Sequence, residues 1–234
     1  MHVFSFYYVC INDDNCIFYY ESLFYRLKVV LRVQCGDEYI FFDKSFWSRI
    51  VITEVDKKVI RYKVIIRQAI EKRKAGKLIA YVPILETKYL AEVVYLLGKT
   101  FTSEIFFVET ALSRKRSSII FDKLQQCIIQ GAEESKNFEF PCLNKKILLL
   151  EELREINHHI LFCYEKSAKK LGNMLNYSFS SDLGFFCGPE QGFKKEEVEF
   201  LLSSNNMIDV SLHQAVLKSI DVLFHVAIFL SMRD

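Results

Sequence analysis

The segment Leu183–Glu197 has the residue types and spacing of a ligand-binding turn. An apolar strand, Leu183–Cys187, runs directly into Gly188-Pro189, and Glu190 and Gly192 follow before a helix begins. Glycine leaves backbone without a side chain, which a ligand can approach closely. The strand is therefore predicted to end at the carboxyl edge of a sheet, where open α/β folds bind ligands. An ordinary strand-to-helix turn is the alternative interpretation, and the proline excludes a helix-packing GxxxG motif.

Other side chains capable of catalysis or metal binding lack partners at a useful spacing. The chain has no GxGxxG, GxxxxGK[ST] or GxSxG motif, so no dinucleotide, P-loop or serine-hydrolase site is predicted. His158-His159 is interpreted as a solvated turn rather than a metal site. Glu133-Glu134 and Glu151-Glu152 are interpreted as solvated helix faces rather than acid/base pairs. The seven cysteines form no CxxC pair, which favours reduced, buried thiols over zinc ligands or disulfides.

Positive charge is concentrated in one stretch of the chain. The net charge is only +2, but nine basic residues between Lys57 and Lys77 accompany a single acid, Glu71. Such a stripe suits the phosphate backbone of a nucleic acid, which attracts Lys and Arg whatever its sequence. A solvated edge strand protected by lysines is the alternative, and the sequence alone does not decide between them.

Composition and length limit the class of protein. The 234 residues are 51% hydrophobic and 26% charged, with 8 Gly and 3 Pro, which excludes collagen-like, disordered and disulfide-scaffold chains. The longest nearly apolar stretch, Val222–Leu230, is far shorter than the roughly 20 residues of a membrane-spanning helix. The N-terminal residues have neither a basic leader nor a small-residue cleavage site, so we expect a cytoplasmic protein.

Hydrophobic periodicity divides the chain near residue 75. The first part reads as strands over 3–10, 16–20, 38–42, 49–55 and 58–66 with one helix over 21–32, which is typical of a small barrel. The second part alternates strands over 78–82, 104–108, 160–164, 183–187 and 207–212 with helices over 86–97, 118–137, 194–202 and 215–232. This alternation predicts a mostly parallel sheet covered by helices. The predicted domains are residues 1–72 and 76–234.

Several segments, in the same order along the chain, resemble one known family. Gly188–Phe193 (GPEQGF), with Glu196 and Glu197 after it, is similar to the GPEGGF(S)xxE signature of the bacterial 16S rRNA (uracil-N3)-methyltransferase family of the SPOUT superfamily. Val30–Glu38 (VLRVQCGDE) is similar to its VLRxxxGDE segment, and Leu97–Ser113 to its LG(V)xEIxPxxxxRS segment, while 123–141 matches a helix of the family. The resemblance covers nearly the whole chain.

The resemblance implies an α/β protein with an N-terminal PUA-like RNA-binding β-barrel and a C-terminal SPOUT domain knotted as a trefoil. It implies S-adenosylmethionine as cofactor, no metal, a homodimer, and 16S rRNA of the small ribosomal subunit as substrate, methylated at N3 of a uridine. The implied cofactor-binding residues are Tyr164, Cys187, Gly188, Pro189, Gly192, Ser211, Leu212, Val216 and Leu217. Glu190 and Lys218 are the implied catalytic groups. With the basic stripe, the implied RNA contacts are Arg26, Lys28, Arg32, Arg61, Lys63, Arg67, Lys72 and Lys88.

The segment Leu212–Val222 departs from the family pattern LGxRILRxETA. His213 stands where the family has Gly, Ala215 replaces the first Arg, and Lys218 replaces an Arg. A Gly-to-His change limits close approach of the backbone to a ligand, and Lys lacks the bidentate fork of Arg. Two alternatives follow: a descendant that has lost catalysis and acts as an RNA-binding or ribosome-assembly factor, and a SPOUT enzyme with another nucleotide target.

Overall fold

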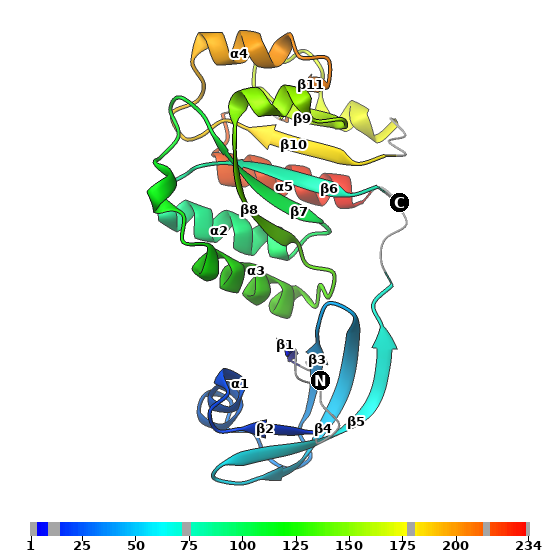
Figure 1. The fold of residues 1–234 in the computed structure, drawn as a ribbon. Coiled ribbons are helices and arrows are strands. Elements are labelled where there is room, and N and C mark those ends of the chain that lie inside the picture. The colour runs from blue at the N-terminus through cyan, green and yellow to red at the C-terminus, as the bar shows by residue number, and fades with distance from the viewer. Residues whose placement is uncertain (1–3, 9–14, 72–75, 177–180, 213–215, 233–234) are drawn as a thin grey trace. The chain divides into compact units, whose positions relative to one another are not determined.

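The computed structural model describes residues 4–8, 15–71, 76–176, 181–212 and 216–232, and the chain forms two compact units (Figure 1). One unit comprises Met1–Lys72 with Glu133–Glu139, and the other comprises Arg73–Ala132 with Phe140–Asp234. The boundary between 72 and 73 lies in the charged segment that separates the two predicted domains. Residues 133–139, which sequence periodicity assigned to the second domain, belong to the first unit.

The first unit is built on a curled five-stranded sheet. Its strand order is β1-β3-β4-β5-β2, with β1 parallel to β3 and the other pairs antiparallel. The elements are β1 (Ser5–Tyr7), β2 (Cys16–Phe18), α1 (Ser22–Tyr25), the π-helical η1 (Arg26–Val30), β3 (Glu38–Phe42), β4 (Phe46–Val55) and β5 (Val59–Ala69). The expected helix over 21–32 is thus one α-helical turn that continues as a π-helix.

Alternation along these strands produces one buried face. Ile50, Ile52, Ile60 and Tyr62 point into a core that also contains Phe41 and the apolar face of α1 and η1. Residues between them face outward, as the period of two requires for a sheet with one buried side. Among the described residues no pairing joins β1 to β2, so the predicted barrel is a curled sheet in the part of the chain that the structure describes.

The second unit is a six-stranded, entirely parallel sheet in the order β11-β9-β10-β6-β7-β8. Its strands are β6 (Leu78–Pro83), β7 (Glu104–Glu109), β8 (Cys142–Leu149), β9 (His159–Cys163), β10 (Leu183–Cys187) and β11 (Met207–Val210). Its helices are α2 (Thr87–Gly98), α3 (Phe121–Ser135), α4 (Lys195–Leu202) and α5 (Ser219–Ser231), with short 3-10 turns η2 (Arg116–Ser118), η3 (Leu150–Glu155) and η4 (Leu171–Asn176).

Both faces of this sheet are covered. Leu78, Ala80 and Val82 of β6 pack with α2, α3 and α5, whereas Ile79 and Tyr81 pack with η3 and α4 on the other face. The central strands β6 and β10 are buried at every residue because helices lie on both sides. The predicted α/β class with a helix-covered parallel sheet is therefore confirmed. The predicted trefoil knot stays a prediction.

Among the described residues, no helix is both long enough and apolar enough to span a bilayer.

Candidate functional site

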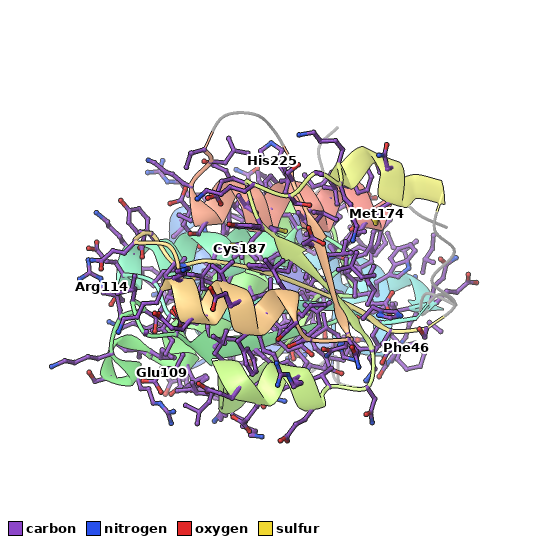
Figure 2. The ribbon with its side chains drawn as sticks, turned by 90° about the horizontal axis from the view of Figure 1, so that it is seen from above. Phe46, Glu109, Arg114, Met174, Cys187 and His225 are labelled. Carbon is purple, nitrogen blue, oxygen red and sulfur yellow. The ribbon has the colours of Figure 1, made fainter. Side chains whose placement is uncertain are left out.

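A cavity of about 990 Å³ opens at the carboxyl ends of β9 and β10, in the second unit. This volume is at the upper end of the range for small-molecule sites. Its wall is formed by the loops that follow β6, β9 and β10, by α4, and by the segment that enters α5. Cys187, marked in Figure 2, is the last residue of β10 and lies in this wall. The predicted turn is thus part of a concave site at the edge where parallel sheets bind ligands.

The turn after β10 owes its shape to Phe193. A Cβ added to Gly188 would lie 2.8 Å from Cε2 of Phe193, and that ring is held edge-on between Phe162 and Phe186, with both centroid distances at 5.5 Å. The space beside Gly188 is therefore filled by a side chain of the same turn. This corrects the expectation that the missing side chain leaves a gap for a ligand.

Gly192 closes the same turn in a backbone conformation that favours glycine. Its φ is +74°, and its N–H donates a 2.9 Å hydrogen bond to the carbonyl of Pro189. L-residues seldom adopt this left-handed conformation. After the turn, Glu197 fixes the start of α4: its carboxylate accepts the backbone N–H of Lys194 and that of Ala111, both at 2.8 Å.

The start of α5 is bonded to the end of β10. Ser219 Oγ donates to the carbonyl of Gly188 at 2.6 Å, and Cys187 Sγ donates to the carbonyl of Ser219 at 3.6 Å. Burial raises the pKa of Cys187 far above its ordinary value and the pKa of Cys163 to about 12. Both thiols therefore stay protonated at neutral pH and serve as wall residues rather than nucleophiles.

Charged side chains of both signs surround the cavity. Glu165, Glu190 and Glu199 supply three carboxylates, and the cations are Lys166, Lys195 and Lys218. Glu190 Oε1 accepts the backbone N–H of Glu86 at 3.3 Å. An apolar pocket with a few charged groups at its rim suits a ligand that has a flat apolar part and a zwitterionic part. Within the described ranges, no group of three His, Cys, Asp or Glu side chains could hold a metal ion.

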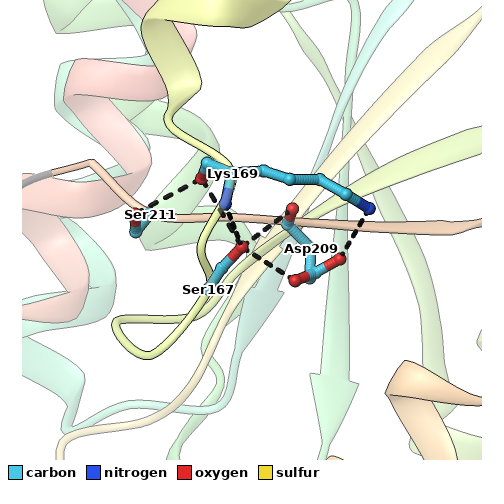
Figure 3. A network of polar contacts seen from close by, with 4 residues as sticks. All are labelled: Ser167, Lys169, Asp209 and Ser211. Atoms are coloured by element: carbon cyan, nitrogen blue, oxygen red, sulfur yellow. Dashed lines mark hydrogen bonds and ion pairs between the residues drawn. The ribbon is translucent and has the colours of Figure 1, made fainter.

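A polar network ties the loop after β9 to β11 (Figure 3). Asp209 accepts hydrogen bonds from Ser167 Oγ at 2.7 Å and from Lys169 Nζ at 3.1 Å. Ser211 N–H donates to the carbonyl of Lys169 at 2.8 Å, and Ser211 Oγ accepts from Lys170 Nζ at 3.1 Å. The network positions the loop that carries Tyr164 and Glu165 into the cavity wall.

All of the cofactor-binding and catalytic residues expected from the sequence line this cavity except Ser211. Ser211 is buried in the polar network instead. His213 and Ala215 lie outside the described residues. The sequence did not single out Leu85, Tyr89, Lys166 or Ile220, which also line the cavity. Leu85 could have been found from its place after β6, because β6 neighbours β10 in the sheet.

The basic stripe on β5 is divided by a β-bulge. Arg61 and Lys63 lie opposite Glu54 and Val51 of β4, on the outer face, but the register shifts at Ile65 and places Arg67 opposite the buried Ser48. The Arg67 guanidinium then lies 4.6 Å from the ring centroid of Phe46. Only Arg61 and Lys63 of these three share the outward face expected of an RNA-binding strip. Lys72 lies outside the described residues.

Of the four remaining candidate RNA contacts, Arg26, Lys28 and Lys88 interact with other groups of the chain, and Arg32 is described by its exposure. Arg26 forms a two-point ion pair with Glu133, with Nη2 at 2.8 Å from Oε2 and Nη1 at 3.1 Å from Oε1. Glu133 is buried, which corrects its interpretation as part of a solvated helix face. Lys28 donates to the backbone carbonyl of Asp56. Arg32 is exposed, and Lys88 lies 3.5 Å from the carboxylate of Glu86.

Two predictions outside the site can also be assessed. His158 Nε2 hydrogen-bonds the hydroxyl of Tyr81 at 3.0 Å, and burial lowers the pKa of His158, so it packs as a neutral side chain. The sequence predicts buried thiols. Of the six described cysteines, Cys16 and Cys187 are buried, Cys127 and Cys163 are half-buried, and Cys35 and Cys142 are exposed.

Comparison with known proteins identifies the family of this chain. The family model for an RNA methyltransferase domain matches residues 72–220, which is more than half of the chain. The chain therefore belongs to the RNA methyltransferase domain family.

Individual relatives cover different parts of the chain. Ribosomal RNA small subunit methyltransferase E of Rickettsia conorii is 28% identical over 104 residues, which span 44% of this chain and less than half, 43%, of that relative. A probable rRNA-methyltransferase from Porphyromonas gingivalis has the same fold, with a TM-score of 0.80 at 19% identity. Ribosomal RNA small subunit methyltransferase E from Neisseria gonorrhoeae, solved bound to S-adenosyl methionine, has a TM-score of 0.81 at 16% identity. Both structures cover 99% of this chain and 98% of their own.

Proposed function

We propose that the protein is an S-adenosylmethionine-dependent methyltransferase that methylates N3 of a uridine in 16S rRNA of the small ribosomal subunit. The observation that carries the proposal is the cavity at the carboxyl ends of β9 and β10, whose lining residues, all but Val222, lie within the RNA methyltransferase domain match. The Rickettsia relative named for small-subunit rRNA methylation supports the substrate, and the Neisseria structure bound to S-adenosyl methionine supports the cofactor. Such a substrate also implies a cytoplasmic location.

The residues of the cavity fit S-adenosylmethionine. Leu212 and Leu217 offer an apolar surface for the adenine ring, and the buried Leu85 and Ile220 lie in the same wall. The carboxylates and ammonium groups at the rim suit its charged amino-acid part, because each sign finds an opposite partner there. Cys187 is buried and Cys163 is half-buried. Their raised pKa values keep both thiols protonated, so they add no competing nucleophile.

The reaction asks little of the protein's side chains. When bound, S-adenosylmethionine supplies a methyl group that is already activated for transfer. The chain must then hold the uracil ring so that N3 faces this methyl group, and it must take up the N3 proton. Glu190 is our candidate for the proton acceptor, and Lys218 is our candidate for the group that stabilises the negative charge spreading onto the uracil oxygens.

We further propose that two copies of the chain form the working enzyme. Val216, at the cavity wall, is 86% exposed, and Leu217 beside it is 36% exposed. A second copy that covered these apolar side chains would complete the wall. Sedimentation velocity of the wild type and of Val216→Glu tests this: a dimer that Val216→Glu dissociates supports the proposal, and a wild-type monomer at all concentrations contradicts it.

The activity is tested with labelled S-adenosylmethionine and small ribosomal subunits that lack the modification, followed by analysis of the modified nucleoside. Label in 3-methyluridine supports the proposal. Glu190→Gln should then slow transfer by about 100-fold or more while cofactor binding by calorimetry is kept. Absence of cofactor binding would contradict the proposal. Binding of cofactor and RNA without methyl transfer would favour the assembly-factor alternative. Label in another nucleoside would show that the enzyme has a different nucleotide target.

A further inference from the structure

Three aromatic side chains at the end of β2 form a ring array on the first unit. Phe18 and Tyr20 are stacked, with ring centroids 5.6 Å apart and planes 5° from parallel. Tyr19 meets Tyr20 edge-on at 5.7 Å. We call Phe18, Tyr19 and Tyr20 the array. Tyr19 is 60% exposed and Tyr20 is 73% exposed, so these two rings of the array face solvent. Single exposed apolar side chains are ordinary, but rings already in contact offer a continuous surface to a flat ligand.

The backbone under the array is fixed. The N–H of Glu21 donates to the carbonyl of Phe18 at 2.9 Å, and the carboxylate of Glu21 accepts the N–H of Phe18 at 2.7 Å. Tyr19 N–H donates to the carbonyl of Lys58 on the neighbouring chain segment at 2.9 Å. These bonds fix the backbone from which the rings project, so the backbone of the turn does not have to be ordered on binding.

Basic side chains lie at both ends of this stretch. Arg61 lies opposite Cys16 in the antiparallel pair of β2 and β5, and its guanidinium is 3.1 Å from Cys16 Sγ. Cys16 precedes Phe18 by two residues, so both side chains are on the same face of β2. Lys57 and Lys58, at the other end, are exposed. Residues 54–63 contain four basic and two acidic side chains, and Glu21 lies in the turn itself, so the surroundings of the array carry one more positive than negative charge. Arg61 also forms an ion pair with Glu54.

We propose that Tyr19 and Tyr20 are a stacking platform for unpaired bases of the RNA substrate, with Arg61 and Lys58 holding the adjacent phosphates. The proposal rests on the proposed function for the nature of the ligand. Proteins recognise single-stranded RNA by stacking bases on exposed aromatic rings within a positively charged surface. A duplex keeps its bases stacked on each other, so the platform favours single strands.

Fluorescence anisotropy of the full chain with a labelled single-stranded RNA of about 12 nucleotides, and with a hairpin of the same composition, tests the platform. Tyr20→Ala should weaken binding of the single strand by about 5- to 150-fold and affect the hairpin less. Tyr20→Phe should keep the wild-type affinity because the ring remains. Tyr25→Ala is the matched control, since Tyr25 is also 60% exposed but is outside the array. Equal losses for Tyr20→Ala and Tyr25→Ala would overturn the proposal.

A base analogue provides a readout that a merely structural role would not change. The fluorescence of 2-aminopurine in the single strand should be quenched by the wild type and by Tyr20→Phe but not by Tyr20→Ala. Calorimetry with S-adenosylmethionine separates the two proposals: missing cofactor binding counts against the proposed function and leaves the base-stacking measurement valid. RNA affinity unchanged in Tyr20→Ala, with altered sedimentation of the protein, would identify the array as a protein interface and overturn the platform.

Discussion

The ring of Phe193 fills the space that a side chain on residue 188 would need. The 2.8 Å separation between an added Cβ at Gly188 and Cε2 of Phe193 is too short for any real contact. Phe162 and Phe186 pack against this ring on two sides, so a shift of the ring would disturb both contacts. The glycine and the phenylalanine, five residues apart, therefore act as one unit that shapes the cavity wall.

Gly188→Ala should lower the free energy of unfolding by about 1–3 kcal/mol, because the extra methyl group forces the ring out of its place. In a Phe193→Leu background the same substitution should cost less, since the smaller side chain leaves room. Urea denaturation of the two single variants and the double variant measures this coupling. Strictly additive losses would show that the contact does not determine the requirement for glycine.

Arg26→Ala should destabilise the first unit rather than weaken RNA binding. The side chain of Glu133 is only 6% exposed, and without Arg26 its carboxylate keeps the N–H of Tyr7 as a donor, at 3.0 Å. Removing a charged hydrogen-bond partner of a buried carboxylate costs about 1–3 kcal/mol. Arg32→Ala, which removes an exposed arginine, is the control and should leave stability unchanged. If Arg26→Ala leaves stability unchanged and weakens RNA binding, Arg26 contacts RNA instead.

Asp209 should make the stability of the second unit depend on acid pH. Burial acts to raise the pKa of Asp209, but hydrogen bonds from Ser167 and Lys169 and the charge of Lys169 outweigh it, so the pKa lies below the ordinary value of 3.8. A carboxyl group with a lowered pKa in the folded state contributes stability above its unfolded pKa, and this is lost as the pH falls through the folded value. The contribution should therefore be complete at pH 7 and disappear below about pH 4.

Denaturation of the wild type and Asp209→Asn across this pH range is the measurement. The variant should be less stable at pH 7, and the difference should shrink as the pH falls below about 4. Glu165→Gln, a change of an exposed carboxylate in the same loop, should show no such convergence. A difference in stability between the two proteins that is the same at every pH would mean that the charge of Asp209 does not stabilise the folded state.

Much of the fold could be predicted because buried parallel strands occur as apolar runs in the sequence. β6 and β10 were recognised in this way, whereas β8 (Cys142–Leu149) was missed. Asn144, Lys145 and Lys146 interrupt its apolar residues, and most of the strand is at least partly exposed at the edge of the sheet. Lysines on an edge strand prevent pairing with other chains, and they also remove the signal by which a strand is recognised.

The residues of the candidate site also differ in whether the sequence alone could identify them. Residues next to glycines, such as Pro189 and Glu190, could be found from the chain itself. Lys166 and Tyr89 could not, because they reach the cavity only through the order of the strands, which brings the ends of β6, β9 and β10 together. No glycine marks the bulge at Ile65, so the sequence contains no sign of it. The sequence therefore counts Arg67 and Arg61 in one basic stripe, although they lie on opposite faces of β5.

This bulge leads to a prediction about the salt dependence of RNA binding. Each phosphate contact that is lost should reduce the slope of log affinity against log salt by about 1. Arg61→Ala and Lys63→Ala should each flatten the slope, because both side chains are on the outer face of β5. Arg67→Ala should leave it nearly unchanged, since the guanidinium lies against the Phe46 ring on the opposite face. Anisotropy titrations at several salt concentrations measure the slopes. A loss for Arg67→Ala equal to that for Arg61→Ala would mean that RNA contacts both faces of the strand.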